Sequence, residues 1–260
     1  MNSDFNSIGQ KPKKINFGEV FNESWNLFSK VVGIGALAVA IFGIASIVVS
    51  QVLGAITGLN YVQKEFQEQI SGISDPDLLI LEVQNFYMDN MNPFITTSLL
   101  TSLIMILAFP LAGGFMLVCR EADKNGAVNI GTLFEGFKPQ YWGRLIVLGL
   151  IYFIISKIAF IFFVIPGIYV WVAAAIACPF VMFTNLSGID ALKASFKMVN
   201  QNWFTVFQVL LVASIIGLVG YLLCLVGRLV SYPFVLISIY MLYKHMIGFE
   251  NQDISKIGEE

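Results

Sequence analysis

Four long, uninterrupted runs of apolar residues constrain this chain more than any other feature. They cover residues 31–56, 94–118, 142–185 and 203–247. A helix needs about 20 apolar residues to cross about 30 Å of hydrocarbon at 1.5 Å per residue. Because 57% of the residues are hydrophobic and only 12% are charged, the sequence predicts an integral membrane protein. This composition and a net charge of −2 exclude a soluble enzyme and a nucleic-acid binder.

The number of crossings follows from the lengths of the runs. The first two runs suffice for one crossing each, and the last two are long enough for two. Breaks are predicted at Pro166-Gly167 and between Cys224 and Arg228. The expected fold is all-α: a polytopic bundle of six transmembrane helices over 31–248. Residues 1–30 form an N-terminal segment, 249–260 an acidic tail, and the first span is expected to be an uncleaved anchor.

The distribution of positive charge predicts the orientation. One side of the six-span arrangement holds Lys11, Lys13, Lys14, Lys30, Arg120, Lys124, Lys138, Arg144, Lys193, Lys197, Lys244 and Lys256. The other side holds Lys64 and Arg228, with Lys157 near its edge. Since lysine and arginine accumulate in cytoplasmic loops, both termini are expected to be cytoplasmic in a bacterial cytoplasmic (inner) membrane.

The exported connection over 57–92 is acidic and is predicted to contain a helix. Ser74 or Asp75 followed by Pro76 is typical of a helix start, and 78–88 carries enough apolar residues to bury one face. Asn92-Pro93 resembles the cap and first turn of the next span. This connection is either a docking loop for an exported partner or a helix lying on the outer surface.

Three segments that precede membrane hairpins look alike and indicate a three-fold internal repeat. They are 16–25, 129–138 and 188–197, and the last two share Ile, Leu three residues on, and Phe-Lys four further. This spacing predicts three short cytoplasmic amphipathic helices. Their Phe137, Lys138, Phe196 and Lys197 are candidate contacts for lipid headgroups or a partner; alternatively, the helices are structural elements at the lipid boundary.

The chemistry of an enzyme or an ion-coupled transporter is not visible in the spans. There is no Asp or Glu within 31–56, 94–118, 142–185 or 203–243. Carboxylate-based coupling and intramembrane aspartyl proteolysis are therefore excluded. The single histidine, His245, is interpreted as a surface residue, and Cys119, Cys178 and Cys224 lie in or at the end of apolar runs. No catalytic residue, metal site or cofactor is expected.

The cations near the membrane are interpreted individually. Arg144, Arg228 and Lys244 are expected to extend to the headgroups as anchors. Lys157 is predicted just under the outer interface, where it either extends to the headgroups or binds a phosphate, alone or together with Arg228 across two hairpins. Both are candidate lipid contacts.

Four prolines are predicted to kink the membrane helices: Pro110, Pro166, Pro179 and Pro233. A proline in a span frees backbone carbonyls, which can line a cavity for a neutral or lipidic substrate. The alternative is that the kinks serve packing alone.

Several motifs resemble a known group of bacterial proteins. They are Pro110 to Met116, the run 163–170, Cys178-Pro179-Phe180-Val181, the segment 188–197 and Asn202-Trp203. Over about 94–248 the chain resembles the YciC-like proteins and the membrane domain attached to some glycerophosphodiester phosphodiesterases. The resemblance implies a six-helix membrane domain without an assigned activity. It does not carry over the activity of the soluble phosphodiesterase domain, which the sequence does not match.

The sequence thus favours a non-enzymatic membrane protein that acts through lipid or protein contacts as an accessory or assembly component. Membrane lipids and a membrane protein are the expected partners. The alternative is a transporter or flippase for a neutral or lipid-like substrate, which would need a continuous polar cavity at mid-membrane depth.

Overall fold

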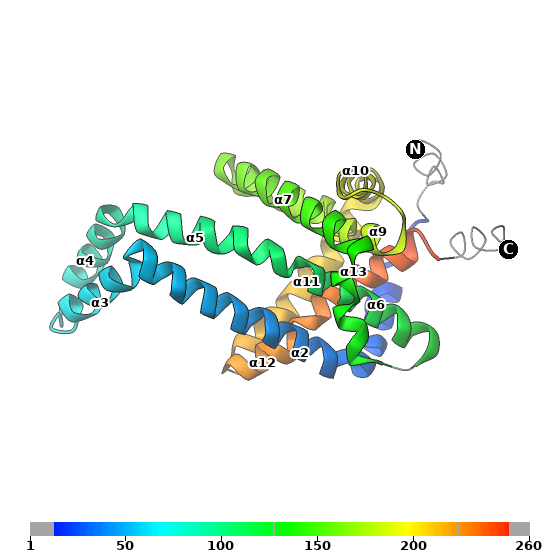
Figure 1. The fold of residues 1–260 in the computed structure, drawn as a ribbon, viewed down its shortest axis with the longest axis horizontal. Helices are drawn as coiled ribbons and strands as arrows, with labels where there is room; N and C mark the ends of the chain where they lie inside the picture. Colours follow the sequence, from blue (N-terminus) through cyan, green and yellow to red (C-terminus); the bar gives the residue numbers. More distant parts are fainter. Residues whose placement is uncertain (1–12, 127, 223, 250–260) are drawn as a thin grey trace. The chain divides into compact units, whose positions relative to one another are not determined.

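The structure is a computed structural model that describes residues 13–126, 128–222 and 224–249 (Figure 1). Side chains are not described for 162 and 221–226. Within the described part the chain is made of helices joined by short connections, so the expected all-α class is confirmed. The expected acidic tail, apart from Phe249, and Lys11 lie outside the described residues.

The helices follow one another closely along the chain. The α-helices are α2 (Phe17–Thr57), α3 (Leu59–Ile70), α4 (Pro76–Asp89), α5 (Met91–Met105), α6 (Phe109–Asn125), α7 (Pro139–Phe162), α8 (Val164–Ala173), α9 (Ala177–Phe183), α10 (Gly188–Val199), α11 (Trp203–Leu222), α12 (Cys224–Ser231) and α13 (Pro233–Met246). Three 3₁₀ helices separate some of them: η1 (Ile106–Ala108), η2 (Ile130–Phe137) and η3 (Asn200–Asn202).

Five helical stretches of the described part are long and apolar enough to cross a membrane. They are Phe17–Thr57, Met91–Asn125, Pro139–Ile161, Val164–Phe183 and Gly188–Gly220. The chain is therefore a membrane protein. The expected sixth crossing falls on α12 and α13, which have 8 and 14 residues. At 1.5 Å per residue α13 alone spans about 21 Å, less than the hydrocarbon thickness, so the sixth crossing stays a prediction.

The break in the third apolar run lies slightly before the predicted Pro166-Gly167. Helix α7 ends at Phe162, Phe163 is extended with φ −168°, and α8 begins at Val164. A proline disfavours helical backbone just before it but is tolerated in the first turn, where its missing N–H has no helical partner. The chain therefore breaks one turn upstream and places Pro166 in the first turn of α8.

The other three prolines follow the same rule. Pro110 is the second residue of α6 and follows η1, Pro179 is the third residue of α9, and Pro233 is the first residue of α13. All four prolines therefore mark starts of helical segments, where a proline costs little.

The chain forms two compact units, one of residues 1–40 and 108–260 and the other of residues 41–107. In the described part of the first unit, α2 presents one buried face made of Val20, Ser24, Leu27 and Val31. The spacing of four, three and four residues keeps these side chains on one side of the helix. The centre of this unit is aromatic; its fully buried rings include Phe115, Phe180, Phe234, Tyr240 and Tyr243.

The second unit contains the expected loop helix. Helix α4 starts as predicted: Pro76 is its first residue and the Asp75 side chain accepts a hydrogen bond of 2.9 Å from the Asp77 N–H. Its Phe86 is buried and stacks on Phe66 of α3 with ring centroids 3.9 Å apart. Helix α5 begins at Met91, so the predicted cap at Asn92 was two residues late.

The three similar segments do not share one structure. Residues 16–25 fall on the start of the 41-residue α2, 130–137 form the 3₁₀ helix η2, and 188–199 form the α-helix α10. Segment η2 packs closely on α6 at two glycines that leave no room for a side chain. A Cβ at Gly114 would collide with the Leu133 carbonyl, and a Cβ at Gly136 would collide with the Pro110 carbonyl. The following Pro139 makes Lys138 extended and ends the segment.

Candidate functional site

The first unit contains a cluster of charged and polar side chains that joins three helices. The Lys244 ammonium of α13 lies 3.1 Å from Glu23 Oε2 of α2 and 2.9 Å from Asp123 Oδ2 of α6. Tyr240 donates a 3.0 Å hydrogen bond from its hydroxyl to Asp123 Oδ2. We call Glu23, Asp123, Tyr240, Lys244 and the adjacent His245 the Lys244 cluster.

Local helix geometry places these groups together. Tyr240 and Lys244 are four residues apart, so both point from one face of α13 toward the last turn of α6, where Asp123 lies. Glu23 lies on α2 one residue before the buried Ser24, whose hydroxyl donates to the Val20 carbonyl at 2.7 Å. Two carboxylates that lie 121 and 221 positions before Lys244 thus meet around its ammonium group.

The ammonium of Lys244 stays charged in this setting. Lys244 lies outside the five candidate spans, and its side chain is 32% exposed. Burial alone would lower the pKa of Lys244, but hydrogen bonds to Asp123 and Glu23 and their negative charges together raise its pKa above the ordinary value. The expectation that Lys244 extends to the headgroups as an anchor stays a prediction; within the protein its ammonium binds two carboxylates.

His245 is also less exposed than expected. Its side chain is 17% exposed, and Nε2 lies 3.3 Å from Glu23 Oε1 in an orientation that makes no hydrogen bond. His245 is therefore a partly buried residue rather than a fully exposed one. In the described part of the chain no group of three His, Cys, Asp or Glu side chains could hold a metal ion.

A second positive group lies among aromatic rings of the same unit. The Arg120 guanidinium of α6 is 5.2 Å from the Phe183 ring centroid and 4.7 Å from that of Phe249. Phe249 in turn stacks near Tyr240 at 5.9 Å. Cation–π contacts of this kind are worth about 0.5–2 kcal/mol. Arg120 therefore helps to fix the chain that follows α13.

Arg144 acts on backbone carbonyls. Its guanidinium donates to the carbonyls of Thr184 at 3.1 Å and Leu186 at 3.4 Å, just after α9, and to its own helix at Gln140. The last carbonyls of a helix lack intrahelical partners, and a cation there also suits the helix dipole. Arg144 thus links α7 to the end of α9 in addition to any interfacial role.

Lys157 and Arg228 each contact an aromatic ring near them in sequence. The exposed Lys157 lies 5.5 Å from the Phe153 ring centroid, and the exposed Arg228 lies 5.8 Å from that of Tyr232. A shared phosphate site of Lys157 and Arg228 stays a hypothesis.

The residues expected at the lipid boundary are only partly buried. Phe137 is 40% exposed, and Lys138 pairs with Glu135 at 2.9 Å. Phe196 is half-buried and makes an edge contact of 6.1 Å with Tyr169 of α8, and Lys197 is exposed. The deeper members of the repeated segments are the leucines: Leu133 is 0% exposed and Leu192 is 6% exposed.

An open groove of about 710 Å³ lies in the first unit, between α2 and the α11–α12 pair. It is lined by Trp25, Phe28, Ile216, Val219, Gly220, Gly227, Val230 and Ser231. The Ser231 hydroxyl donates to the Gly217 carbonyl at 2.9 Å, so this polar side chain is already satisfied. The groove therefore presents an apolar surface to any ligand.

Neither the Lys244 cluster nor this groove was predicted from the sequence. Glu23 and Asp123 were visible as acidic residues in polar segments, but their shared partner is distant in sequence. The spacing of Tyr240 and Lys244 on one helical face was a detectable signal. The groove depends on a close approach of α11 and α12, where a Cβ at Gly220 would meet Ser231 and the Gly227 carbonyl.

Comparison with known proteins identifies relatives but no function. The chain is similar to the uncharacterized protein Rv2560 of Mycobacterium tuberculosis, at 28% identity over 239 residues, which cover 89% of this chain and 68% of the relative. The uncharacterized protein Mb2590 of Mycobacterium bovis matches with the same identity and coverage. No family model matches the chain. No solved structure matches it either.

Proposed function

We propose that this chain is a non-enzymatic accessory or assembly component of a bacterial cytoplasmic membrane that acts through lipid and protein contacts. In this proposal it crosses the membrane six times, has both termini in the cytoplasm and belongs with the YciC-like proteins. The observation that carries the lipid part of the proposal is the apolar groove between α2 and the α11–α12 pair.

The groove has the chemistry of an acyl-chain site. A lipid tail offers only CH₂ and CH₃ groups, and each CH₂ buried against apolar side chains contributes about 0.8 kcal/mol. Trp25, which is 53% exposed and stacks on Phe28 at 5.7 Å, lines the groove. Tryptophan favours the boundary between acyl chains and headgroups, so Trp25 fits a place near the ester region of a bound phospholipid.

The ionisable groups of the same unit support a contact role over an ion-coupled one. Lys244 is bound by Glu23 and Asp123, and Asp123 also accepts from Tyr240. A carboxylate that already bridges an ammonium and a phenol hydroxyl holds helices together. It is poorly placed to bind and release a proton in each cycle of an ion-coupled transporter.

The test is lipid retention by the intact protein after purification in a mild detergent. Ile216→Trp fills the groove, whereas Ile215→Trp places the same ring on the neighbouring residue, which is 51% exposed and does not line the groove. Lipid mass spectrometry should show a several-fold loss of bound phospholipid for Ile216→Trp alone. Equal retention by both variants would remove the groove from the proposal.

A flippase is the alternative function and is separated by a second assay. The lining of the groove is apolar, and moving a headgroup requires a polar path through the hydrocarbon. Proteoliposomes should therefore translocate fluorescent phospholipid no faster than protein-free vesicles. Protein-dependent translocation that Ile216→Trp abolishes would favour the flippase over the accessory role.

A further inference from the structure

The second unit exposes an apolar helix face that the proposed function does not use. Five large apolar side chains of α4 are between 52% and 72% exposed: Leu78, Ile80, Leu81, Tyr87 and Met88. An exposed apolar patch of this kind on a segment that also carries many charged residues commonly marks an interaction site.

Helix periodicity places Leu81 and Met88 on the side of α4 that points away from its own packing, whereas Tyr87 at the edge of this side also contacts Phe94, with ring centroids 5.1 Å apart. Phe86 is the buried residue of α4; its ring centroid lies 3.9 Å from that of Phe66 and 5.7 Å from that of Phe94. Leu81 and Met88 are seven residues apart, about two turns, and so share one stripe of the helix. That stripe lies roughly opposite Phe86, since Leu81 is five residues before it.

The surroundings of this face are acidic. Helices α3 and α4 and the turn between them carry Glu65, Glu68, Asp75, Asp77, Glu82 and Asp89 against the single cation Lys64. Within the described part of the chain none of these carboxylates takes part in an ion pair; the paired carboxylates are those of Glu23, Asp123 and Glu135. The apolar face of α4 is therefore bordered by uncompensated negative charge.

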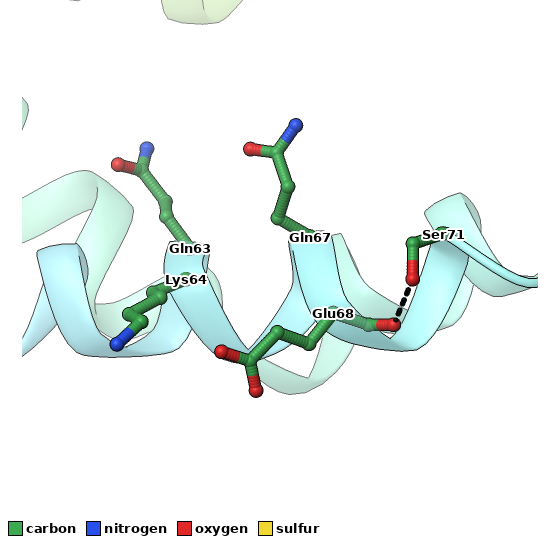
Figure 2. Close-up of a pocket in the computed structure, with 5 residues that line it drawn as sticks. All are labelled: Gln63, Lys64, Gln67, Glu68 and Ser71. Atoms are coloured by element: carbon green, nitrogen blue, oxygen red, sulfur yellow. Dashed lines mark hydrogen bonds between the residues drawn. The ribbon is translucent and has the colours of Figure 1, made fainter.

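The outer surface of α3 differs from that of α4. Figure 2 shows a shallow polar pocket on α3, with Gln63 and Gln67 on one side of the helix and Lys64 and Glu68 on another. The Ser71 hydroxyl donates to the Glu68 carbonyl at 2.8 Å. All of the residues that line this pocket are polar or charged and none is a large apolar side chain, so this surface serves as an internal reference for α4.

We propose that the exposed face of α4 is a docking surface for a partner protein, which contacts it through an amphipathic segment whose apolar residues are flanked by lysine and arginine. Apolar contact with Leu81 and Met88 supplies affinity, as in helix-in-groove recognition. Opposite charge around the contact supplies orientation and a faster association rate.

Two other occupants fit the face less well. A helix that lies on a membrane surface usually carries lysine or arginine on its polar side, but α4 has neither, and its carboxylates repel anionic headgroups. A second copy of the chain would bring the same acidic face against itself in a two-fold contact and place like charges together. A basic partner avoids both costs.

The experiment uses the full chain in its own cells, with a photo-activated benzophenone amino acid at Leu81 or Met88. The same group at Gln67 on α3 is the reference position. Irradiation should yield a protein product at Leu81 and Met88 several-fold above that at Gln67. Mass spectrometry of the product should locate the crosslink in a segment of net positive charge with helically spaced apolar residues.

A pair of charge variants tests the electrostatic part with the same change in net charge. Asp77→Asn with Asp89→Asn removes two negative charges beside the face, whereas Gln63→Lys with Gln67→Lys adds two positive charges on α3. The first variant should lower the Met88 crosslink several-fold and the second should change it little. Crosslinks to lipid, to a second copy or to an acidic segment, no product above the reference, or equal effects of both variants would overturn the proposal.

Discussion

Replacing Lys244 by Met should measurably destabilise the first unit. Methionine keeps an unbranched chain of similar length but has no charge, so the substitution removes the ammonium with little change in volume. The substitution removes the bonds of the ammonium to Glu23 at 3.1 Å and to Asp123 at 2.9 Å. The loss falls on contacts between α13 and both α2 and α6.

The size of the effect follows from the exposure of each partner. The Glu23 side chain is 43% exposed, so this arm contributes as a surface pair, about 0.5 kcal/mol. The Asp123 side chain is 21% exposed, and a hydrogen bond to a charged group that is largely buried contributes about 1.5–3 kcal/mol. Lys244→Met should therefore lower the free energy of unfolding by about 2–3.5 kcal/mol.

The loss of stability should be largest for Lys244→Met, smaller for Asp123→Asn and smallest for Glu23→Gln. Asp123→Asn should cost less than Lys244→Met, because the amide oxygen still accepts from Tyr240 at this site. Glu23→Gln should cost least, since its arm is the most exposed. Lys193→Met on α10 is the matched control: Lys193 is exposed, and its loss should change stability by less than about 0.5 kcal/mol.

The assay is thermal or denaturant unfolding in detergent, followed by near-ultraviolet circular dichroism of the buried aromatic core. The loss of stability in a double variant of Lys244 and Asp123 should be smaller than the sum of the losses in the two single variants. Each single variant already removes the same Lys244–Asp123 bond. Equal stability of Lys244→Met and Lys193→Met, or a larger loss for Glu23→Gln than for Asp123→Asn, would contradict this prediction.

The contribution of Lys244 to stability should be lost at high pH. The pKa of Lys244 is raised in the folded protein, so its contribution is fully present below the unfolded-state pKa of about 10.4. The contribution is lost as pH rises through the higher folded-state pKa. The stability difference between the wild type and Lys244→Met should thus be constant from about pH 7 to 9 and shrink above about pH 10.5. A difference that shrinks already between pH 7 and 9 would contradict this assignment.

Three further predictions test the orientation and the helix contacts. Cysteine at Lys124 should resist a membrane-impermeant thiol reagent in intact cells while cysteine at Gln67 reacts, and the opposite pattern would invert the proposed topology. Arg144→Gln should lower the free energy of unfolding by about 1–2 kcal/mol through its lost bonds to the carbonyls after α9, measured by the same unfolding assay. Leu133→Asp should destabilise more than Phe137→Asp, because Leu133 is 0% and Phe137 40% exposed; equal effects would show that Phe137 is buried by lipid.

The class of the fold was predictable from the sequence because it depends on local properties. A run of about 20 apolar residues can satisfy its backbone in hydrocarbon only as a helix, whatever its neighbours are. The start of α4 at Pro76 was predictable for the same reason, since the Asp75 cap bonds to a backbone N–H two residues away. The break before α8 was predicted within three residues because a proline acts on the turn around it.

The repeated segments show where local pattern stopped being sufficient. Their shared spacing predicted three similar helices, yet η2 is a 3₁₀ helix, whereas α10 is an α-helix. We attribute the difference to Gly114 and Gly136, because without their Cβ atoms η2 can approach α6 more closely than residues with side chains would allow. Pro139, which directly follows Lys138 after η2, also contributes. Such close approach depends on the partner helix, which a pattern within one segment does not contain.

The candidate sites were decided by tertiary structure alone. The amino-acid pattern alone indicates that Lys244 ends an apolar helix, where a cation suits the headgroups. Only the packing of α2, α6 and α13 brings Glu23 and Asp123 within 3.1 Å of its ammonium and makes Lys244 a link between helices. The groove beside Trp25 likewise exists only where α2 meets the α11–α12 pair. Coulombic pairing and surface shape depend on distances between residues far apart in the chain, and sequence order does not encode those distances directly.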